Sequence, residues 1–193
     1  WNGRPGVVIF DYNRDGLLDI YITAEADRSN RLYRNDGGLT FTDVGDQAGV
    51  GALESHSTGA VACDLDNDGY QDLYVGAWGD PDDGLDFRST GVMPGNTDNL
   101  FLNNGDDTFT DVTATAFGDD VNFRSATSIG CSDVDGDGWL DLYVGNLLGN
   151  DFRDFATANH AGHYNLLYIN NRDMTFTEMA REVGVEGPEI MML

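Results

Sequence analysis

One nine-residue pattern, D-x-[DN]-x-D-G-x-x-D, occurs three times in this chain of 193 residues. The copies span residues 11–19, 64–72 and 133–141. Each copy has an oxygen-bearing side chain at positions 1, 3, 5 and 9, and a glycine at position 6 that permits a sharp turn. Acids crowded into one turn repel each other unless a cation lies among them. The pattern therefore indicates a tight loop with a cation among its acids.

A hard cation such as Ca²⁺ takes about six to eight oxygen ligands, and alternate residues of a tight loop can direct several oxygens inward. We therefore expect three calcium sites with a structural role, in which each ion pins the connection between two strands. Side chains come from positions 1, 3, 5 and 9, and a backbone carbonyl comes from position 7. The expected ligands are Asp11, Asn13, Asp15, Leu17 and Asp19; Asp64, Asp66, Asp68, Tyr70 and Asp72; and Asp133, Asp135, Asp137, Trp139 and Asp141. The alternative is a solvated Asp-Gly turn without metal.

The loops begin like those of an EF-hand, but the rest of the pattern differs. An EF-hand needs a bidentate acid at position 12 and a helix on each side. Position 12 is occupied here by Ile22, Val75 and Val144, whose side chains have no oxygen. The flanking residues are β-branched and aromatic, which favours strands. We therefore expect each loop to join two strands, which cover residues 7–10 and 19–22, 60–63 and 72–75, and 128–131 and 141–144.

The similarity between the three copies continues beyond the loops. A third short strand is expected at residues 30–35, 99–104 and 165–170, and a fourth at 40–44, 108–112 and 175–179. A closing segment follows in two copies, at 47–50 and 182–185. Four antiparallel strands repeated at intervals of tens of residues are typical of propeller blades.

We therefore expect an all-β fold of β-propeller type, with three blades of four antiparallel strands and a calcium loop between strands. One domain spans residues 1–193, with repeats at about 4–50, 57–118 and 124–185 and a C-terminal tail at 186–193.

The motifs D-x-[DN]-x-D-G-x-x-D, D-[LI]-Y-[VI], N-x-L-[FY]-x-N and F-T-[DE], in this order, resemble the FG-GAP/VCBS repeat family over nearly the whole chain. That family includes the integrin α-chain propeller, the cartilage acidic protein type and many bacterial surface proteins. The resemblance implies a calcium-binding β-propeller, secreted or at the cell surface, that acts in adhesion or assembly.

Family propellers close with more blades than the three found here, and an open arc exposes the apolar side faces of its terminal blades. Two partners could cover these faces. One is a set of flanking blades in a longer chain; the other is a second copy of the chain in a homo-oligomer, ring or filamentous polymer.

The connection between the second and third strands is long in two repeats, at residues 77–98 and 146–164, but short in the first, at 23–29. Both insertions contain Asp-Phe-Arg, at 86–88 and 151–153. An aromatic ring beside an arginine can stack on a carbohydrate or protein ligand, or it can anchor the loop on its own blade. A carbohydrate-binding or carbohydrate-active domain with its site on these insertions is the alternative function. The histidines at 56, 160 and 163 are expected to be structural or exposed, not zinc ligands.

Charge limits the choice of partners. The chain has 34 acidic residues against 10 basic ones and a net charge of −24, which argues against binding to nucleic acid or to anionic membranes. No apolar run approaches the roughly 18 residues that suggest a membrane span, so membrane insertion is not expected. Weak, exposed calcium loops suit the millimolar calcium outside cells, so the expected location is extracellular or the cell surface.

Motifs for chemistry are missing from the sequence. It has no nucleophile elbow, phosphate loop or dinucleotide fingerprint. We therefore expect no enzymatic activity, and an extracellular structural or adhesive role.

The two cysteines have different positions relative to their loops. Cys63 lies one residue before its loop and Cys131 lies two before its own. Alternation along a strand then directs them to opposite faces of superposed repeats. The sequence leaves two alternatives open, a disulfide between neighbouring repeats or two buried free thiols.

Overall fold

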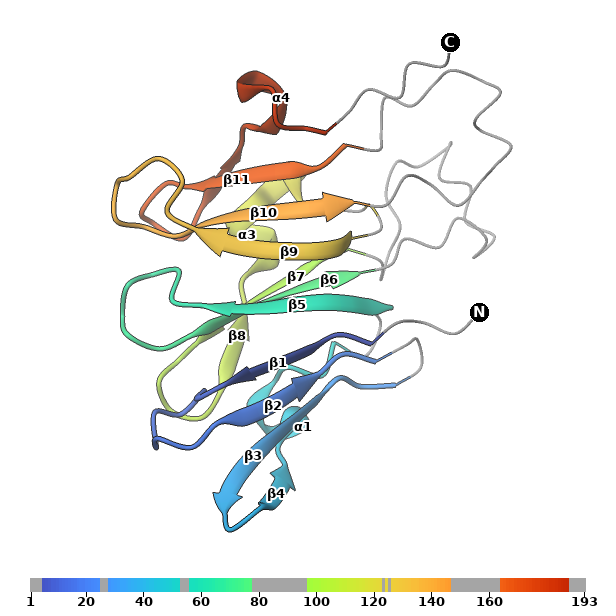
Figure 1. The fold of residues 1–193 in the computed structure, drawn as a ribbon, viewed down its shortest axis with the longest axis vertical. Coiled ribbons are helices and arrows are strands. Elements are labelled where there is room, and N and C mark those ends of the chain that lie inside the picture. The colour runs from blue at the N-terminus through green and yellow to red at the C-terminus, as the bar shows by residue number, and fades with distance from the viewer. Residues whose placement is uncertain are drawn as a thin grey trace, which may run out of the picture.

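The computed structural model describes residues 5–24, 28–52, 56–77, 97–122, 124, 126–146 and 164–187. Within these residues the chain forms three four-stranded antiparallel sheets, and strands that follow one another in the chain are neighbours in each sheet. The sheets lie one after another along the long axis of the molecule and do not close into a ring (Figure 1). The predicted all-β fold with propeller-like blades is confirmed.

The strand bounds follow the repeated pattern of the sequence. The first blade contains β1 (Val7–Phe10), β2 (Asp19–Ile22), β3 (Arg31–Gly37) and β4 (Thr40–Asp43). The second contains β5 (Ser57–Cys63), β6 (Asp72–Ala77), β7 (Asn99–Asn103) and β8 (Phe109–Asp111). The third contains β9 (Ala126–Ser132), β10 (Asp141–Asn146), β11 (Leu166–Asn170) and β12 (Phe176–Glu178).

A short helix follows the fourth strand in every blade. These helices are α1 (Gly45–Ala48), α3 (Thr113–Phe117) and α4 (Ala180–Val183), and the 3₁₀ turn η1 (Gly118–Asp120) follows α3. The sequence pattern predicted a closing segment in the first and third blades only. The second blade has such a segment too, in which Ala116 and Phe117 are buried. It was missed because it does not end in Gly-Val, as the segments of the other two blades do.

The register of β7 corrects one alignment made from the sequence. Tyr21, Tyr74 and Tyr143 pair with Leu32, Leu100 and Leu167 of the third strands. Asn103 in the second blade therefore corresponds to Asn35 and Asn170, and Asp98 corresponds to Asn30 and Asn165. The sequence-based alignment had placed residues 99–104 one position too late, because three asparagines lie within this run and any two adjacent frames look alike.

The apolar core lies mainly between the blades. β5 packs against β1 on one side and against β9 on the other. Phe109 of the second blade stacks on Tyr12 of the first, with ring centroids 6.2 Å apart. Phe176 of the third blade stacks on Phe117 of the second, with centroids 5.2 Å apart. The phenylalanines of the second and third F-T-[DE] strands thus pack on the preceding blade.

A disulfide joins Cys63 in β5 to Cys131 in β9, with the two Cα atoms 6.7 Å apart. Cys63 pairs in register with Asp72 and Cys131 with Leu142, so the two cysteines are one residue out of phase in their blades. One face of the second blade meets the opposite face of the third. Side chains of opposite parity are therefore the ones that can meet across this interface. The disulfide alternative holds, and the cysteines are not free thiols.

Among the residues that the structure describes, no helix has the length and apolar character needed to cross a membrane.

Candidate metal centres at the blade loops

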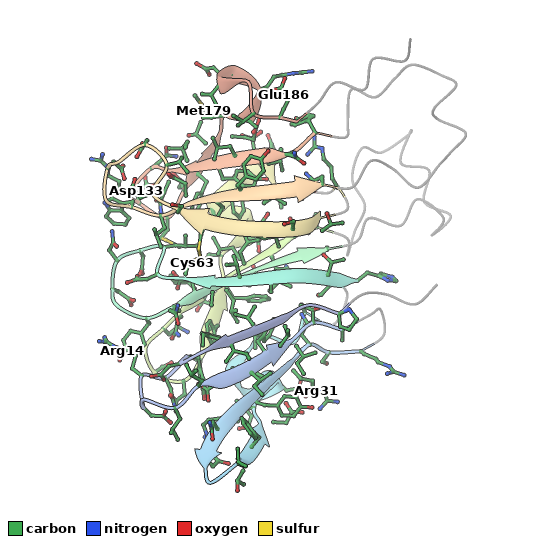
Figure 2. The ribbon with its side chains drawn as sticks, viewed as in Figure 1. Arg14, Arg31, Cys63, Asp133, Met179 and Glu186 are labelled. Atoms are coloured by element: carbon green, nitrogen blue, oxygen red, sulfur yellow. A yellow bond between two sulfur atoms is a disulfide. The ribbon has the colours of Figure 1, made fainter. Side chains whose placement is uncertain are left out.

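The three D-x-[DN]-x-D-G-x-x-D loops connect the first and second strands of their blades, and they lie along the same edge of the molecule, on the left in Figure 1. Figure 2 labels Arg14 in the first loop and Asp133 in the third on this edge. The predicted connection of two strands by each loop is confirmed.

Two residues of each loop have the left-handed backbone conformation. At position 6 they are glycines, as expected, with φ of 85° at Gly16, 93° at Gly69 and 91° at Gly138. Position 4 has the same conformation, which the sequence analysis missed, with φ of 58° at Arg14, 61° at Asn67 and 78° at Gly136. Asparagine and glycine tolerate this region best, so their presence at position 4 of two loops was the available signal.

Backbone amides turn the carboxylates of positions 1 and 5 into the loop. The position-6 N–H donates to the position-1 carboxylate, from Gly16 to Asp11 (2.9 Å), from Gly69 to Asp64 (3.0 Å) and from Gly138 to Asp133 (2.9 Å). The position-7 N–H donates to the position-5 carboxylate, from Leu17 to Asp15 (2.8 Å), from Tyr70 to Asp68 (2.7 Å) and from Trp139 to Asp137 (2.8 Å).

The aspartate at position 9 is buried in all three loops and accepts two backbone hydrogen bonds. One donor is the N–H of position 2 in the same loop, at 3.1 Å for Tyr12 to Asp19, 2.9 Å for Leu65 to Asp72 and 2.9 Å for Val134 to Asp141. The other is an asparagine at the end of the third strand or just within it, at 2.8 Å for Asn35, 2.9 Å for Asn103 and 2.9 Å for Asn170.

These three asparagines are site residues that the sequence analysis did not assign. The signal that could have identified them is the pattern [ND]-x-L-[FY]-x-N, which begins with Asp98 in the second blade.

Burial and neighbouring acids disfavour the charged forms of these carboxylates. Desolvation raises the pKa of Asp72 to about 7, although two backbone hydrogen bonds act in the opposite direction. Burial also raises the pKa of Asp19, with a smaller contribution from the charges of Asp15 and Asp11. The pKa of Asp66 rises through desolvation and through the nearby charge of Asp68. A cation in the loop would relieve this cost.

In two loops the carboxylates converge. Oxygens of Asp64, Asp66 and Asp72 lie within 4.8 Å of one another, and so do those of Asp133, Asp135 and Asp141. Asp64 Oδ1 is buried and has no hydrogen-bond partner, although it belongs to an otherwise well-bonded loop. An unpaired carboxylate oxygen beside two further carboxylates is a donor set that fits a hard, oxygen-binding cation.

Other expected ligands are placed differently. In the first loop, Asn13 donates its amide to Asp15 at 3.2 Å and accepts the Asp15 N–H at 3.2 Å. Asp68 and Asp137, expected from position 5, do not belong to the two converging groups of the described residues. Asp137 pairs with Arg172 at 2.7 Å, and hydrogen bonds from the Trp139 amide and Arg172 lower its pKa.

The alternative carbohydrate site was expected on the insertions at residues 77–98 and 146–164, which extend over residues that the structure does not describe. Both Asp-Phe-Arg motifs and the histidines at 160 and 163 lie outside the described residues.

Comparison with known proteins gives three results. The FG-GAP-like repeat family matches residues 11–75 and 82–144. Cartilage acidic protein 1 of Xenopus tropicalis is 28% identical over 81 residues, which cover 42% of this chain and 12% of that protein. A lectin of Agrocybe aegerita that recognises non-reducing terminal N-acetylglucosamine aligns with a TM-score of 0.47 and 20% identity, over 91% of this chain and 37% of the lectin. The chain thus spans a minor part of both proteins.

Proposed function

This chain belongs to the FG-GAP-like repeat family, and on that premise we propose that it is an extracellular calcium-binding β-propeller repeat protein. Its role in this proposal is structural or adhesive, and it has no enzymatic activity. The disulfide between the second and third blades supports the location, since disulfides persist mainly in oxidising compartments outside the cytosol.

The observation that carries the calcium proposal is the convergence of Asp64, Asp66 and Asp72, in a loop where the buried Oδ1 of Asp64 has no hydrogen-bond partner. The third loop repeats the convergence of three carboxylates, and the first repeats the backbone conformation and the position-9 hydrogen bonds. Bound Ca²⁺ would neutralise the acids and hold the strand connection closed. Each ion would also reduce the net charge of −24, which opposes compaction through self-repulsion.

The test is the substitution Asp64→Asn. Asparagine keeps the size of the side chain and an acceptor for the Gly69 N–H, but it replaces one carboxylate oxygen with an amide donor that cannot bind a cation. We expect calcium affinity at the second loop to fall at least about tenfold, equal to about 1.4 kcal/mol. The rise in melting temperature on adding calcium should shrink with it. Isothermal titration calorimetry and thermal unfolding, each in calcium and in chelator, measure both effects.

Asp119→Asn is the matched control, because it removes the same charge from an exposed residue of η1. This control should bind calcium and melt like the unchanged chain. If Asp64→Asn also does so, calcium does not hold the second loop.

The exposed face of the first blade supports a further protein partner. Phe41 of β4 is 38% exposed, whereas the equivalent Phe109 and Phe176 are 7% and 6% exposed because each packs on the preceding blade. Val7 and Ile9 of β1 are also exposed. The first blade thus exposes a phenylalanine that the second and third blades bury.

The third blade has the complementary exposed face. Val134, at position 2 of its loop, is 55% exposed, whereas the equivalent Tyr12 and Leu65 are each 1% exposed under the following blade. We propose that the third blade of a second copy covers the first blade of this one, head to tail, as the first blade covers the second within the chain. Such a heterologous contact generates a ring or an open filament.

A further inference from the structure

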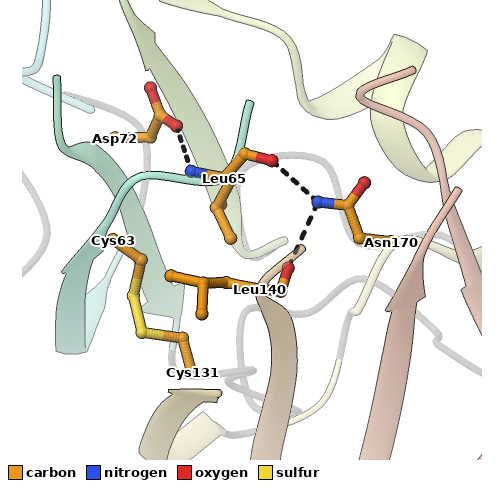
Figure 3. Close-up of a disulfide and its surroundings, with 6 residues drawn as sticks. All are labelled: Cys63, Leu65, Asp72, Cys131, Leu140 and Asn170. Atoms are coloured by element: carbon orange, nitrogen blue, oxygen red, sulfur yellow. Dashed lines mark hydrogen bonds between the residues drawn. A yellow bond between two sulfur atoms is a disulfide. The ribbon is translucent and has the colours of Figure 1, made fainter. Parts of the chain in front are cut away.

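The asparagine near the end of each third strand contacts two loops, not one. Asn103 Nδ2 donates to the Gln71 carbonyl of its own loop at 3.2 Å and to the Tyr12 carbonyl of the preceding loop at 2.8 Å. Asn170 Nδ2 does the same, to Leu140 at 3.1 Å and to Leu65 at 2.8 Å (Figure 3). Each amide therefore bridges the loops of neighbouring blades.

These contacts form part of a continuous series of hydrogen bonds. Tyr12 and Leu65, whose carbonyls accept from the asparagines, occupy position 2 of their loops and donate their own N–H to the position-9 aspartate. The asparagines donate their backbone N–H to the position-9 aspartate of their own loop. The series runs from Asp19 through Tyr12, Asn103, Asp72, Leu65 and Asn170 to Asp141, with every bond between 2.8 and 3.1 Å.

Every member of this series is buried. Water therefore cannot replace a lost partner easily, and a carbonyl deprived of its asparagine would remain unpaired in the interior. The position-2 peptide of one loop and the position-9 aspartate of the next must consequently adopt their geometry together.

The loops also touch near their exposed tips, through the position-4 side chains. Asn67 Nδ2 donates to the Gly138 carbonyl of the third loop at 3.2 Å. The guanidinium of Arg14 lies over the ring of Tyr70 in the second loop, 5.1 Å from its centroid. Neighbouring loops are thus connected both in the interior and at the surface.

From this geometry we propose that Asn103 and Asn170 couple neighbouring calcium loops, so that calcium in one loop raises the calcium affinity of the next. The proposal rests on the calcium-binding function proposed above and assigns these asparagines as positioning residues. Calcium orders a loop and with it the position-2 carbonyl. The asparagine that binds this carbonyl then holds the position-9 aspartate of the next loop. The second ion therefore orders a loop that is already partly fixed, which gives positive cooperativity.

The experiment follows the three sites separately in one sample. The position-6 amides of Gly16, Gly69 and Gly138 each donate to the position-1 aspartate of their own loop. In an NMR titration with Ca²⁺, the ¹H–¹⁵N signals of Gly16, Gly69 and Gly138 therefore report calcium binding at the first, second and third site, respectively.

Weakening the second site by Asp64→Asn should then lower calcium affinity at both neighbouring sites, by about fivefold or more. In an Asn103→Ala background the same change should leave the first site unaffected, while the third site, still connected through Asn170, responds as before.

Asn35→Ala is the matched control. Asn35 makes the same bonds within its blade as Asn103, to Leu18, to Asp19 and to the Gly37 N–H, but it contacts no preceding loop among the described residues. Its substitution should change the first site alone and leave the coupling between sites intact.

Asn170→Ala provides a second test at an interface that the Cys63–Cys131 disulfide holds together even when hydrogen bonds are lost. It should uncouple the third site from the second. The proposal is overturned if Asp64→Asn leaves the first and third sites unchanged in the otherwise unaltered chain, or if coupling survives both asparagine substitutions. If none of the three glycine signals responds to Ca²⁺, the proposed calcium function fails and this proposal fails with it.

Discussion

At the scale of single residues, Asp98 gives the second blade a chemistry that the other two do not share. Its counterparts Asn30 and Asn165 donate an amide N–H to the tyrosine hydroxyl of the second strand, at 2.8 and 3.1 Å. In the second blade the direction is reversed, and the Tyr74 hydroxyl donates to Asp98 at 2.7 Å. Asp98 is 1% exposed, and desolvation raises its pKa to about 7 although the amide of Asn122 and other donors act to lower it.

The raised pKa predicts a pH dependence of stability. Between the ordinary pKa of 3.8 and the folded value of about 7, the folded protein binds more protons at Asp98 than the unfolded chain does. Its contribution to stability is therefore greatest below about pH 4 and is lost as the pH rises through about 7. Asp98→Asn should remove this slope, which amounts to a few kcal/mol at about 1.4 kcal/mol per pKa unit.

Urea unfolding of both proteins at saturating calcium between about pH 4 and pH 8 measures the difference. Asp119→Asn is again the surface control and should keep the slope of the unchanged chain. Parallel curves for Asp98→Asn and the unchanged chain would show that Asp98 does not titrate differently in the folded state. Asp98 accepts hydrogen bonds from the Ala77 N–H, the Tyr74 hydroxyl and the Asn122 amide, and it interacts with Arg124 and Tyr168 electrostatically. These groups are the same in both proteins.

At the scale of elements, the two interfaces between blades have different sets of contacts. The second and third blades are joined by the Cys63–Cys131 disulfide, by the Asn170 amide and by Phe176 on Phe117. The first and second blades have the corresponding asparagine and aromatic contacts but no disulfide. Of these three kinds of contact, the disulfide is the one that the interface between the first and second blades lacks.

Replacing both cysteines with serine should lower the free energy of unfolding by about 2–4 kcal/mol, since the bond closes a loop across a sequence separation of 68 residues. Urea unfolding in calcium measures this change. Dithiothreitol should destabilise the unchanged chain by a similar amount and leave the serine variant unaffected. Equal sensitivity of both proteins to the reductant would show that the disulfide is absent in solution.

At the scale of the whole molecule, two opposed features bear on the proposed association of copies. The exposed faces of the first and third blades match the surfaces buried between blades, which favours stacking. The net charge of −24 on each copy opposes it. Calcium would shift this balance by neutralising part of the charge and by ordering loops at the edges of these faces.

Light scattering with negative-stain imaging should accordingly show regular particles of many 21.0 kDa copies in calcium, which dissociate in chelator. Phe41→Asp should block this assembly, because it places a charge in the proposed contact. Leu39→Asp, at the fully exposed turn before the same strand, is the control and should assemble normally. A monomer that persists in calcium would contradict self-assembly and favour flanking blades of a longer chain as the cover for both faces.

The sequence by itself determined the strands, the loops that join them and the number of blades, because each of these depends on short, repeated spacings. The glycine turn at position 6 and the acid at position 9 could be assigned for the same reason, whereas the burial of that acid emerged only from the structure. Only the tertiary structure decided which residues meet across blades. Asn170 and Leu65 lie 105 residues apart, Asn103 and Tyr12 lie 91 apart, and the cysteines lie 68 apart. Such pairs depend on how one twisted sheet packs on the next. The repeated sequence pattern defines each blade separately, so it does not specify how far one blade is shifted relative to its neighbour.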